Sequence, residues 1–246
     1  MSYKQGAEVI TIISVFLLAG IVKGVIGLGL PTIAMGLLTV VMPPASAASL
    51  LIIPSLVTNI WQLFIGPAFF RLIKRLWGLI AGIFIGTLFS VLPGLTSTSS
   101  WTEAALGIVL IMYGLWGLIA TKLPSPGKAE KWLSPLVGYL TGAITAATGV
   151  FVIPAVPYLQ SLQLNKDDLV QSLGLAFTAS TLALAMHLSL DSKLDHVDYA
   201  LSAIALIPAI AGMYAGQYLR KLISELAFRR CFFIGLIALG AYMTIK

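Results

Sequence analysis

The sequence Gly20-Ile-Val-Lys-Gly-Val-Ile-Gly-Leu-Gly-Leu-Pro31 interrupts an apolar run that extends from Val9 to Met42. A single membrane-spanning helix needs only about 20 apolar residues, so this run is too long for one crossing. Glycine and proline weaken helices, and inside a membrane the backbone groups that they free must bond to protein or water. The run is therefore expected to be either two short helices folded as a hairpin or one helix that unwinds in its middle.

A second apolar run, Ser134–Gln160, has the same character. It is interrupted at Thr145-Ala-Ala-Thr-Gly149, and Pro154 and Pro157 follow the interruption. Each interrupted run is followed by three continuous apolar runs of membrane-spanning length. These predicted spans are Ala45–Gly66, Lys74–Leu92, Ser100–Thr121, Asp168–Leu190, Tyr199–Leu219 and Ala227–Ile245.

The composition of the chain also favours a membrane protein, with a very hydrophobic soluble protein as the alternative. The 246 residues are 59% hydrophobic and only 10% charged, whereas a soluble domain carries roughly 25% charged residues. The formal net charge is +6, but the bases lie in short segments between apolar runs. The lipid bilayer is therefore an expected partner and nucleic acid is not.

The two halves of the chain are predicted to be copies of one unit. The aligned residues are Gly20, Gly24, Ser49, Leu50 and Thr58 in the first half and Gly138, Gly142, Ser172, Leu173 and Thr181 in the second. We expect residues 1–122 to form the first membrane repeat and residues 134–246 the second. Residues 123–133 are expected to be a cytoplasmic linker.

Four basic connections set the expected orientation, because the positive-inside rule assigns such connections to the cytoplasm. They contain Arg71, Lys74 and Arg75; Lys122, Lys128 and Lys131; Lys166; and Arg220, Lys221, Arg229 and Arg230. The loops at 93–100 and 191–198 and both termini are then external. With this orientation each interrupted run enters and leaves on one side, and the halves face opposite ways. The expected fold is an all-α, polytopic membrane protein of two inverted repeats, each a re-entrant hairpin plus three spanning helices.

Lys23 is the first candidate for substrate binding, since intramembrane ionisable residues usually mark a pathway. The alternative is that its side chain extends to the headgroups. The two interruptions are further candidates, because unpaired N–H groups and the positive end of a helix dipole can hold an oxyanion. The candidate residues there are Gly27, Gly29 and Thr32 in the first half and Thr145, Thr148 and Gly149 in the second. The alternative for these glycines is close helix packing.

Polar side chains on one face of the helix Ala45–Gly66 are also candidates. Ser55, Thr58, Asn59 and Gln62 recur at helical spacing and would face the protein rather than lipid. The corresponding helix of the second half carries Gln171, Ser172, Thr178 and Thr181. These side chains could bind an anion or bond to neighbouring helices.

The order of these features resembles the TauE/SafE family of sulfite and organosulfur anion transporters. The resemblance rests on residues 20–31, on Ser55, Thr58 and Asn59, and on the second copy from Gly138 to Pro154 with Gln171 and Ser172. The family usually has a Gly-x-Gly-Gly-Gly run before a proline, whereas Leu28 and Leu30 interrupt the run here. The resemblance implies transport of sulfite, a sulfonate or a related small anion across the cytoplasmic membrane.

The expected function is therefore a secondary transporter of a small inorganic or organic anion that works by alternating access between the two interruptions. Export is favoured because a negative cell interior expels anions. No phosphate-binding loop and no metal-ligand spacing occurs in the sequence, so no cofactor and no enzymatic activity is expected. An anion channel of the same fold and a membrane enzyme acting on a lipid phosphate are the alternatives. The anion, the coupling ion (a proton being the simplest) and the oligomeric state, monomer or homodimer, stay open.

Overall fold

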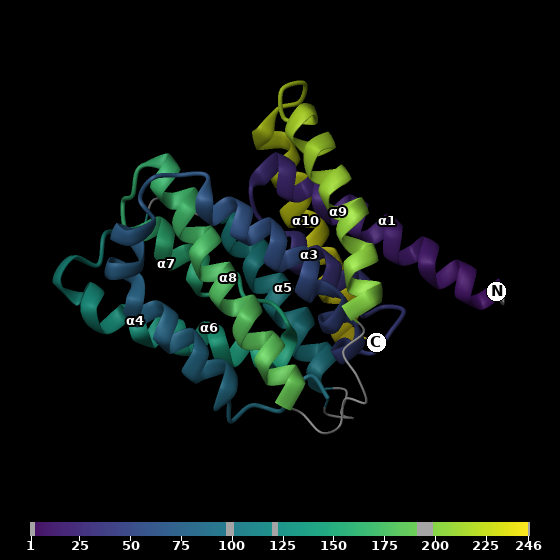
Figure 1. The fold of residues 1–246 in the computed structure, drawn as a ribbon, viewed down its shortest axis with the longest axis horizontal. Coiled ribbons are helices and arrows are strands. Elements are labelled where there is room, and N and C mark those ends of the chain that lie inside the picture. The colour runs from purple at the N-terminus through teal and green to yellow at the C-terminus, as the bar shows by residue number, and fades with distance from the viewer. Residues whose placement is uncertain (1–2, 97–100, 120–122, 191–198, 246) are drawn as a thin grey trace.

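The computed structural model describes residues 3–96, 101–119, 123–190 and 199–245, and its regular elements are all helices (Figure 1). They are α1 (Tyr3–Ile26), α2 (Leu30–Leu38), α3 (Pro44–Phe64), α4 (Phe69–Leu88), α5 (Trp101–Ile119), the short 3₁₀ helix η1 (Gly127–Ala129), α6 (Glu130–Thr148), α7 (Ala155–Ser161), α8 (Lys166–Leu190), α9 (Tyr199–Leu219) and α10 (Glu225–Ile245). The prediction of an all-α polytopic protein is confirmed. The expected external loop at 191–198 lies outside the described residues.

Six of the described helices are long and apolar enough to cross a membrane. They are α1 from Glu8 onward, α3, α5, α8, and nearly all of α9 and α10. Five of the six coincide with predicted spans. The helix α4 was also expected to span, but it is not among them. Its first two turns contain three charged residues, Arg71, Lys74 and Arg75, which leave too short an apolar stretch. The sixth is α1, which is longer than one arm of a short hairpin would be.

Both predicted interruptions are present. Residues 27–29 separate α1 from α2, and residues 149–154 separate α6 from α7. Gly27 and Gly29 have φ of 81° and 103°, and Gly149 has φ of 70°, which only glycine adopts without a steric cost. A methyl group on Gly29 would lie 3.3 Å from Val22 of α1. The chain therefore turns back, and α2 packs against α1.

The halves interlock through two pairs of helices. α1 packs along α9 and α6 packs along α4, and Figure 1 shows the two pairs at opposite sides of the molecule. A methyl group on Gly24 would overlap the carbonyl oxygen of Met213, and one on Gly142 would overlap that of Ile83. The aligned glycines thus make equivalent contacts, and the backbones touch because small residues line both pairs. The repeat boundaries and the opposite orientation of the halves remain predictions.

The helices α3 and α8 cross at the centre, where Gly174 packs against the backbone at Leu63. Pro54 lies inside α3 and has no N–H, so the carbonyl of Leu50 loses its helical partner. The hydroxyl of Ser202 on α9 donates to that carbonyl at 2.9 Å and accepts the N–H of Ile53 at 3.1 Å. Ser202 therefore stabilises the part of α3 that Pro54 weakens, which directly precedes the turn that carries Thr58 and Asn59.

Replacing Gly216 by Ala should lower the stability of the protein, because the added methyl group would overlap the carbonyl oxygen of Ile21 on α1. Overpacking of a tight contact costs about 1–3 kcal/mol. We therefore expect the unfolding temperature in detergent to fall by roughly 2–10 °C. Gly235→Ala on α10 is the matched control, because nothing lies within 4 Å of its added methyl group. Equal unfolding temperatures for the two variants would contradict the close α1/α9 contact.

Candidate functional site

Lys23 lies in the last turn of α1, and the residue is only 5% exposed. Its Nζ donates one hydrogen bond to Thr58 Oγ1 at 3.0 Å and another to Asn59 Oδ1. The side chain therefore turns inward to α3 rather than outward to the surface. Lys23 thus contacts the polar face of α3 at Thr58 and Asn59, which were themselves candidate site residues.

Asn59 extends this contact to the second half of the chain. Its Nδ2 donates to Thr181 Oγ1 on α8 at 3.4 Å, and the Thr181 hydroxyl donates to the carbonyl of Phe177 at 2.7 Å. The Thr58 hydroxyl likewise donates to the carbonyl of Pro54 at 2.7 Å. Every donor in this network thus points away from Lys23, which leaves only acceptors facing the amine. Such an arrangement suits the protonated form, which has three N–H donors and no acceptor.

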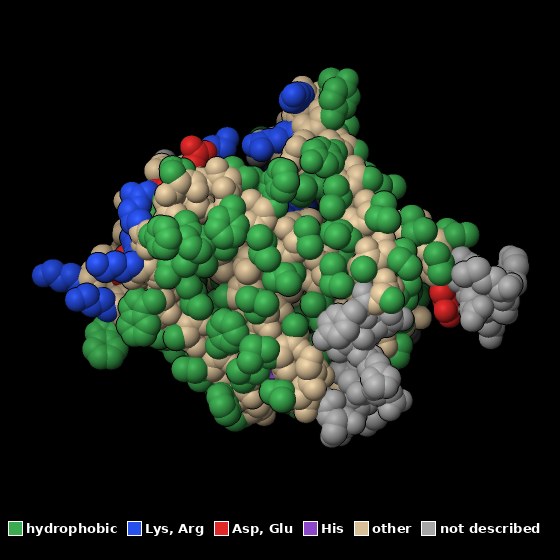
Figure 2. Space-filling model, viewed as in Figure 1, with side chains coloured by type: hydrophobic (Ala, Val, Ile, Leu, Met, Phe, Trp, Pro, Cys, Tyr) green, Lys and Arg blue, Asp and Glu red, His purple; other side chains and the backbone are tan. Residues whose placement is uncertain are grey.

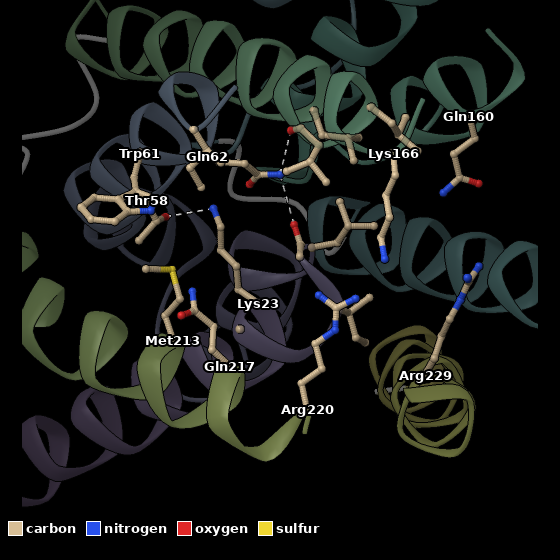
Figure 3. A pocket seen from close by; sticks show the side chains of 18 of the residues that line it. Lys23, Thr58, Trp61, Gln62, Gln160, Lys166, Met213, Gln217, Arg220 and Arg229 are labelled. Carbon is tan, nitrogen blue, oxygen red and sulfur yellow. Dashed lines mark hydrogen bonds between the residues drawn. The ribbon is translucent and has the colours of Figure 1, made fainter. Parts of the chain in front are cut away.

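Gln62 holds the first interruption against α8. Its Nε2 donates to the carbonyl of Gly27 at 3.4 Å and to that of Val170 at 3.1 Å (Figure 3). The backbone carbonyl that the turn at residues 27–29 exposes is thereby satisfied inside the protein. Gln62 therefore fixes the position of Gly27 beside Lys23.

A cavity of about 500 Å³ adjoins these residues. Lys23, Gly27, Thr58 and Gln62 line one part of it (Figure 3). The other part is lined by polar and basic side chains near the ends of α7, α8, α9 and α10, which are Gln160, Lys166, Gln217, Arg220 and Arg229. No Asp or Glu of the described residues lines the cavity. Its lining is therefore positively charged.

Most of the described basic side chains on the surface gather at the same end of the molecule. In Figure 2 the Lys and Arg side chains lie along one margin, and hydrophobic side chains cover most of the face below them. Lys166 begins α8, and Arg220 directly follows α9. The cavity therefore reaches this basic margin of the molecule.

The other predicted residues of the first half, Gly29, Thr32, Ser55 and Asn59, are not part of the cavity lining. The hydroxyls of Thr32 and Ser55 are buried and have no hydrogen-bond partner among the described residues. Gly29 packs against Val22 and Phe232. These three residues do not line the cavity, although Ser55 is on the same helix as Thr58.

The second interruption meets the first half through Met35 of α2. The sulfur of Met35 would lie 2.9 Å from a methyl group on Gly149. The hydroxyls of Thr145 and Thr148 donate to carbonyls of their own helix, those of Thr141 and Ile144, each at 2.7 Å. The two interruptions are thus linked by α2, but the second does not line the cavity.

Three predicted residues of α8 make structural bonds. Gln171 Nε2 donates to the carbonyls of Leu63 and Gly66 at 2.7 and 2.6 Å, and its Oε1 accepts the N–H of Ala68 at 3.0 Å. It therefore satisfies the backbone at the end of α3. The hydroxyls of Ser172 and Thr178 bond to carbonyls within α8.

Several cavity residues were not among the predicted site residues. Lys166, Arg220 and Arg229 carried only a topological signal in the sequence, because their positions between apolar runs say nothing about which way they face. Tyr113 of α5 also lines the cavity and is fully buried. No pattern in the sequence distinguishes it from an ordinary aromatic residue of a packed helix.

The family model described as "Sulfite exporter TauE/SafE" matches residues 12–243. The match includes both interruptions, the network around Lys23 and every described residue that lines the cavity. No curated protein and no solved structure matches the chain.

Replacing Gln171 by Ala should destabilise the protein without changing anion flux per folded molecule. The variant leaves two carbonyls and one N–H at the end of α3 without their partner, and each unsatisfied buried group costs about 1–3 kcal/mol. The unfolding temperature should fall by at least several degrees. Ser172→Ala is the control, because its hydroxyl bonds only within α8. Unchanged stability combined with lost flux would instead assign Gln171 to the substrate.

Proposed function

Because the chain belongs to the sulfite exporter TauE/SafE family, we propose that it is a secondary transporter that exports a small anion. The proposed substrates are sulfite, a sulfonate or another organosulfur or carboxylate anion. The observation that carries this proposal is Lys23, a buried amine beside a cavity that no described acidic side chain lines.

A buried ammonium needs a compensating charge. Removing an ion from water costs several kcal/mol unless a partner repays it. The ion pairs found among the described residues join Arg71 to Asp168 and Arg75 to Glu130, and neither involves Lys23. Thr58 and Asn59 accept two of the three N–H groups of the ammonium. The third is available to an anion in the cavity, which would supply both the charge and the missing acceptor.

Two features support alternating access. The cavity lies at the basic margin, which we assign to the cytoplasm, so an anion would enter from inside the cell. The equivalent contacts of the α1/α9 and α6/α4 pairs support two related states of one architecture, as in transporters with inverted repeats. We propose that the anion then moves outward past Ser55 and Thr32, whose buried hydroxyls would serve as acceptors and donors along the path. The interruption at Thr145, Thr148 and Gly149 would form the far wall.

The membrane potential favours export of an anion. A charge that crosses the membrane changes its free energy by about 2.3 kcal/mol per 100 mV. The free energy of an anion falls by this amount when it leaves a negative interior, so export needs no coupling ion. Import would require one, and a proton is the simplest candidate.

Replacing Lys23 by Gln should reduce sulfite flux from proteoliposomes by roughly 10- to 100-fold, because one charge-assisted hydrogen bond to the anion is lost. Lys221→Gln is the control, since Lys221 is exposed and does not line the cavity. The unfolding temperature of Lys23→Gln should stay equal or rise, because an uncompensated buried charge has been removed. Normal flux through Lys23→Gln would disprove the assignment of Lys23 to the substrate.

Counterflow separates a carrier from a channel of the same fold. Unlabelled sulfite on the opposite side of the membrane should accelerate the exchange of labelled sulfite, because a loaded carrier reorients more readily than an empty one. Flux that rises linearly with concentration and shows no such acceleration would indicate a channel.

A further inference from the structure

We propose that a second cavity, closed in this structure, opens between α4, α6 and α8 at the end of the molecule opposite to the basic margin, and that the anion leaves through it. This inference rests on the proposed function and adds to it the site of release. The lining of the second cavity includes the hydroxyl groups of Thr87, Thr141 and Thr145. We call these three residues the exit threonines.

The contacts of the α1/α9 pair and of the α6/α4 pair correspond residue by residue. A methyl group on Gly216 of α9 would overlap the carbonyl oxygen of Ile21 on α1. In the other pair, a methyl group on Gly86 of α4 would overlap the carbonyl oxygen of Tyr139 on α6. The same correspondence relates the contacts of Gly212 with Leu17 and of Gly82 with Pro135, and those of Gly20 with Ala209 and of Gly138 with Leu79.

This register gives a counterpart to the residues of α1 and α9 that line the cavity beside Lys23. A methyl group on Gly24 would lie 2.9 Å from the backbone nitrogen of Gln217, which lines that cavity. A methyl group on Gly142 would lie 2.6 Å from the backbone nitrogen of Thr87. Thr87 is therefore the counterpart of Gln217. By the same register, the counterparts of the lining residues Lys23 and Gly27 are Thr141 and Thr145.

The exit threonines lie far from the basic margin. The first turn of α4 carries Arg71, and Thr87 lies roughly 24 Å further along the same helix. The helix α6 begins with Glu130, which pairs with Arg75 of α4, and Thr145 lies near its other end. Figure 1 shows α4 and α6 packed together over this length. The second cavity would thus open at the face opposite to the first.

The exit threonines are closed off in this structure. Each of them is 0% exposed, whereas Gln217, the counterpart of Thr87, is exposed. The Thr87 hydroxyl donates to the carbonyl of Ile83 at 2.8 Å and to that of Gly142, across the contact with α6, at 3.2 Å. The two ends therefore differ as the open and the closed end of a transporter with alternating access differ.

The chain that follows α4 covers this closed end. A methyl group on Gly94 would lie 3.6 Å from Nε2 of His187 on α8 and 4.0 Å from the carbonyl oxygen of Ala146 on α6. Leu95 is only 3% exposed. At the other end of the molecule, the turn after α9 begins with Arg220, which is exposed and lines the first cavity. Opening of the second cavity requires Gly94 and Leu95 to move away from α6 and α8.

The chemistry of the exit threonines suits release of an anion. The hydroxyls of Thr141 and Thr145 donate to carbonyls one turn earlier in α6, at 2.8 and 2.7 Å. To bind an oxyanion, each hydroxyl must rotate and exchange that bond for one to the anion, so the net gain is small. The ammonium of Lys23 makes charge-assisted hydrogen bonds, which are about twice as strong. The anion is therefore held at Lys23 and let go at the exit threonines.

Cysteine labelling tests whether this end opens. In a Cys231→Ser background, Thr87→Cys and Thr141→Cys should react with a membrane-impermeant maleimide only from the face opposite to the basic margin, in membrane vesicles of defined orientation. Gln217→Cys should react from the basic face. Ala147→Cys is the control, because Ala147 is 1% exposed on the same helix as Thr141 but outside the proposed lining. It should react at least tenfold more slowly from either face. Sulfite is left out of the labelling because it adds to maleimides.

The labelled protein tests whether the anion uses this exit. Once the reagent is removed, labelled Thr87→Cys should export radiolabelled sulfite at least tenfold more slowly than before labelling, because the adduct fills the exit. Equilibrium binding of sulfite to the same purified protein should stay within twofold. We expect the same result for Thr141→Cys. Labelling of the native Cys231, which is exposed and does not line the first cavity, should leave export unchanged.

The possible failures are distinguishable. Reaction of Thr87→Cys and Thr141→Cys as slow as that of Ala147→Cys, or from the basic face, would overturn the second cavity. Full export by both labelled variants would overturn the exit route. Sulfite export by the wild type would leave the proposed function intact in each of these cases. No binding and no export of sulfite by the wild type would overturn the proposed function and the inference together.

Discussion

Every backbone group that a broken membrane helix leaves unpaired must find a partner within the protein, and this constraint shapes the centre of the molecule. Gln62 bonds to the carbonyl of Gly27 at the first interruption. Ser202 bonds to the carbonyl that Pro54 leaves without a partner. Gln171 satisfies three groups at the end of α3. Because these side chains come from other helices, each break fixes the position of its neighbours.

The glycine contacts bring helices of different halves close together. At Gly24 and Gly142 the backbones of α1 and α9, and of α6 and α4, touch directly. Between these two flanks, polar side chains of α3 and α8 meet at the centre. Asn59 can then reach from Lys23 on one side to Thr181 on the other. The polar network thus lies between two tightly packed flanks.

In the proposed function, the arrangement around Lys23 exchanges stability for anion binding. A buried cation without a carboxylate partner among the described residues weakens the folded state, yet its surroundings contain acceptors directed toward it. Such a residue is most easily explained by a ligand that supplies the missing charge. Stabilised variants that lose transport would be the expected result of removing it, as at other functional sites that lower stability.

Much of this protein could be predicted from sequence because lipid makes local patterns decisive: apolar runs must span, glycine–proline breaks must be supported, and a lysine deep in such a run must find polar partners. Five of the six predicted spans and both interruptions follow from that rule. Only the tertiary structure decided which polar groups serve the backbone and which face the cavity. Gln62 and Gln171 have the same chemistry. Gln62 lines the cavity, whereas the side chain of Gln171 is hydrogen-bonded to the backbone at the end of α3. Lys166 is far in the chain from Arg220 and Arg229, which lie on either side of the turn between α9 and α10, and no helical period relates the three residues. Their convergence depends on how α8, α9 and α10 pack, which a pattern within one helix cannot encode.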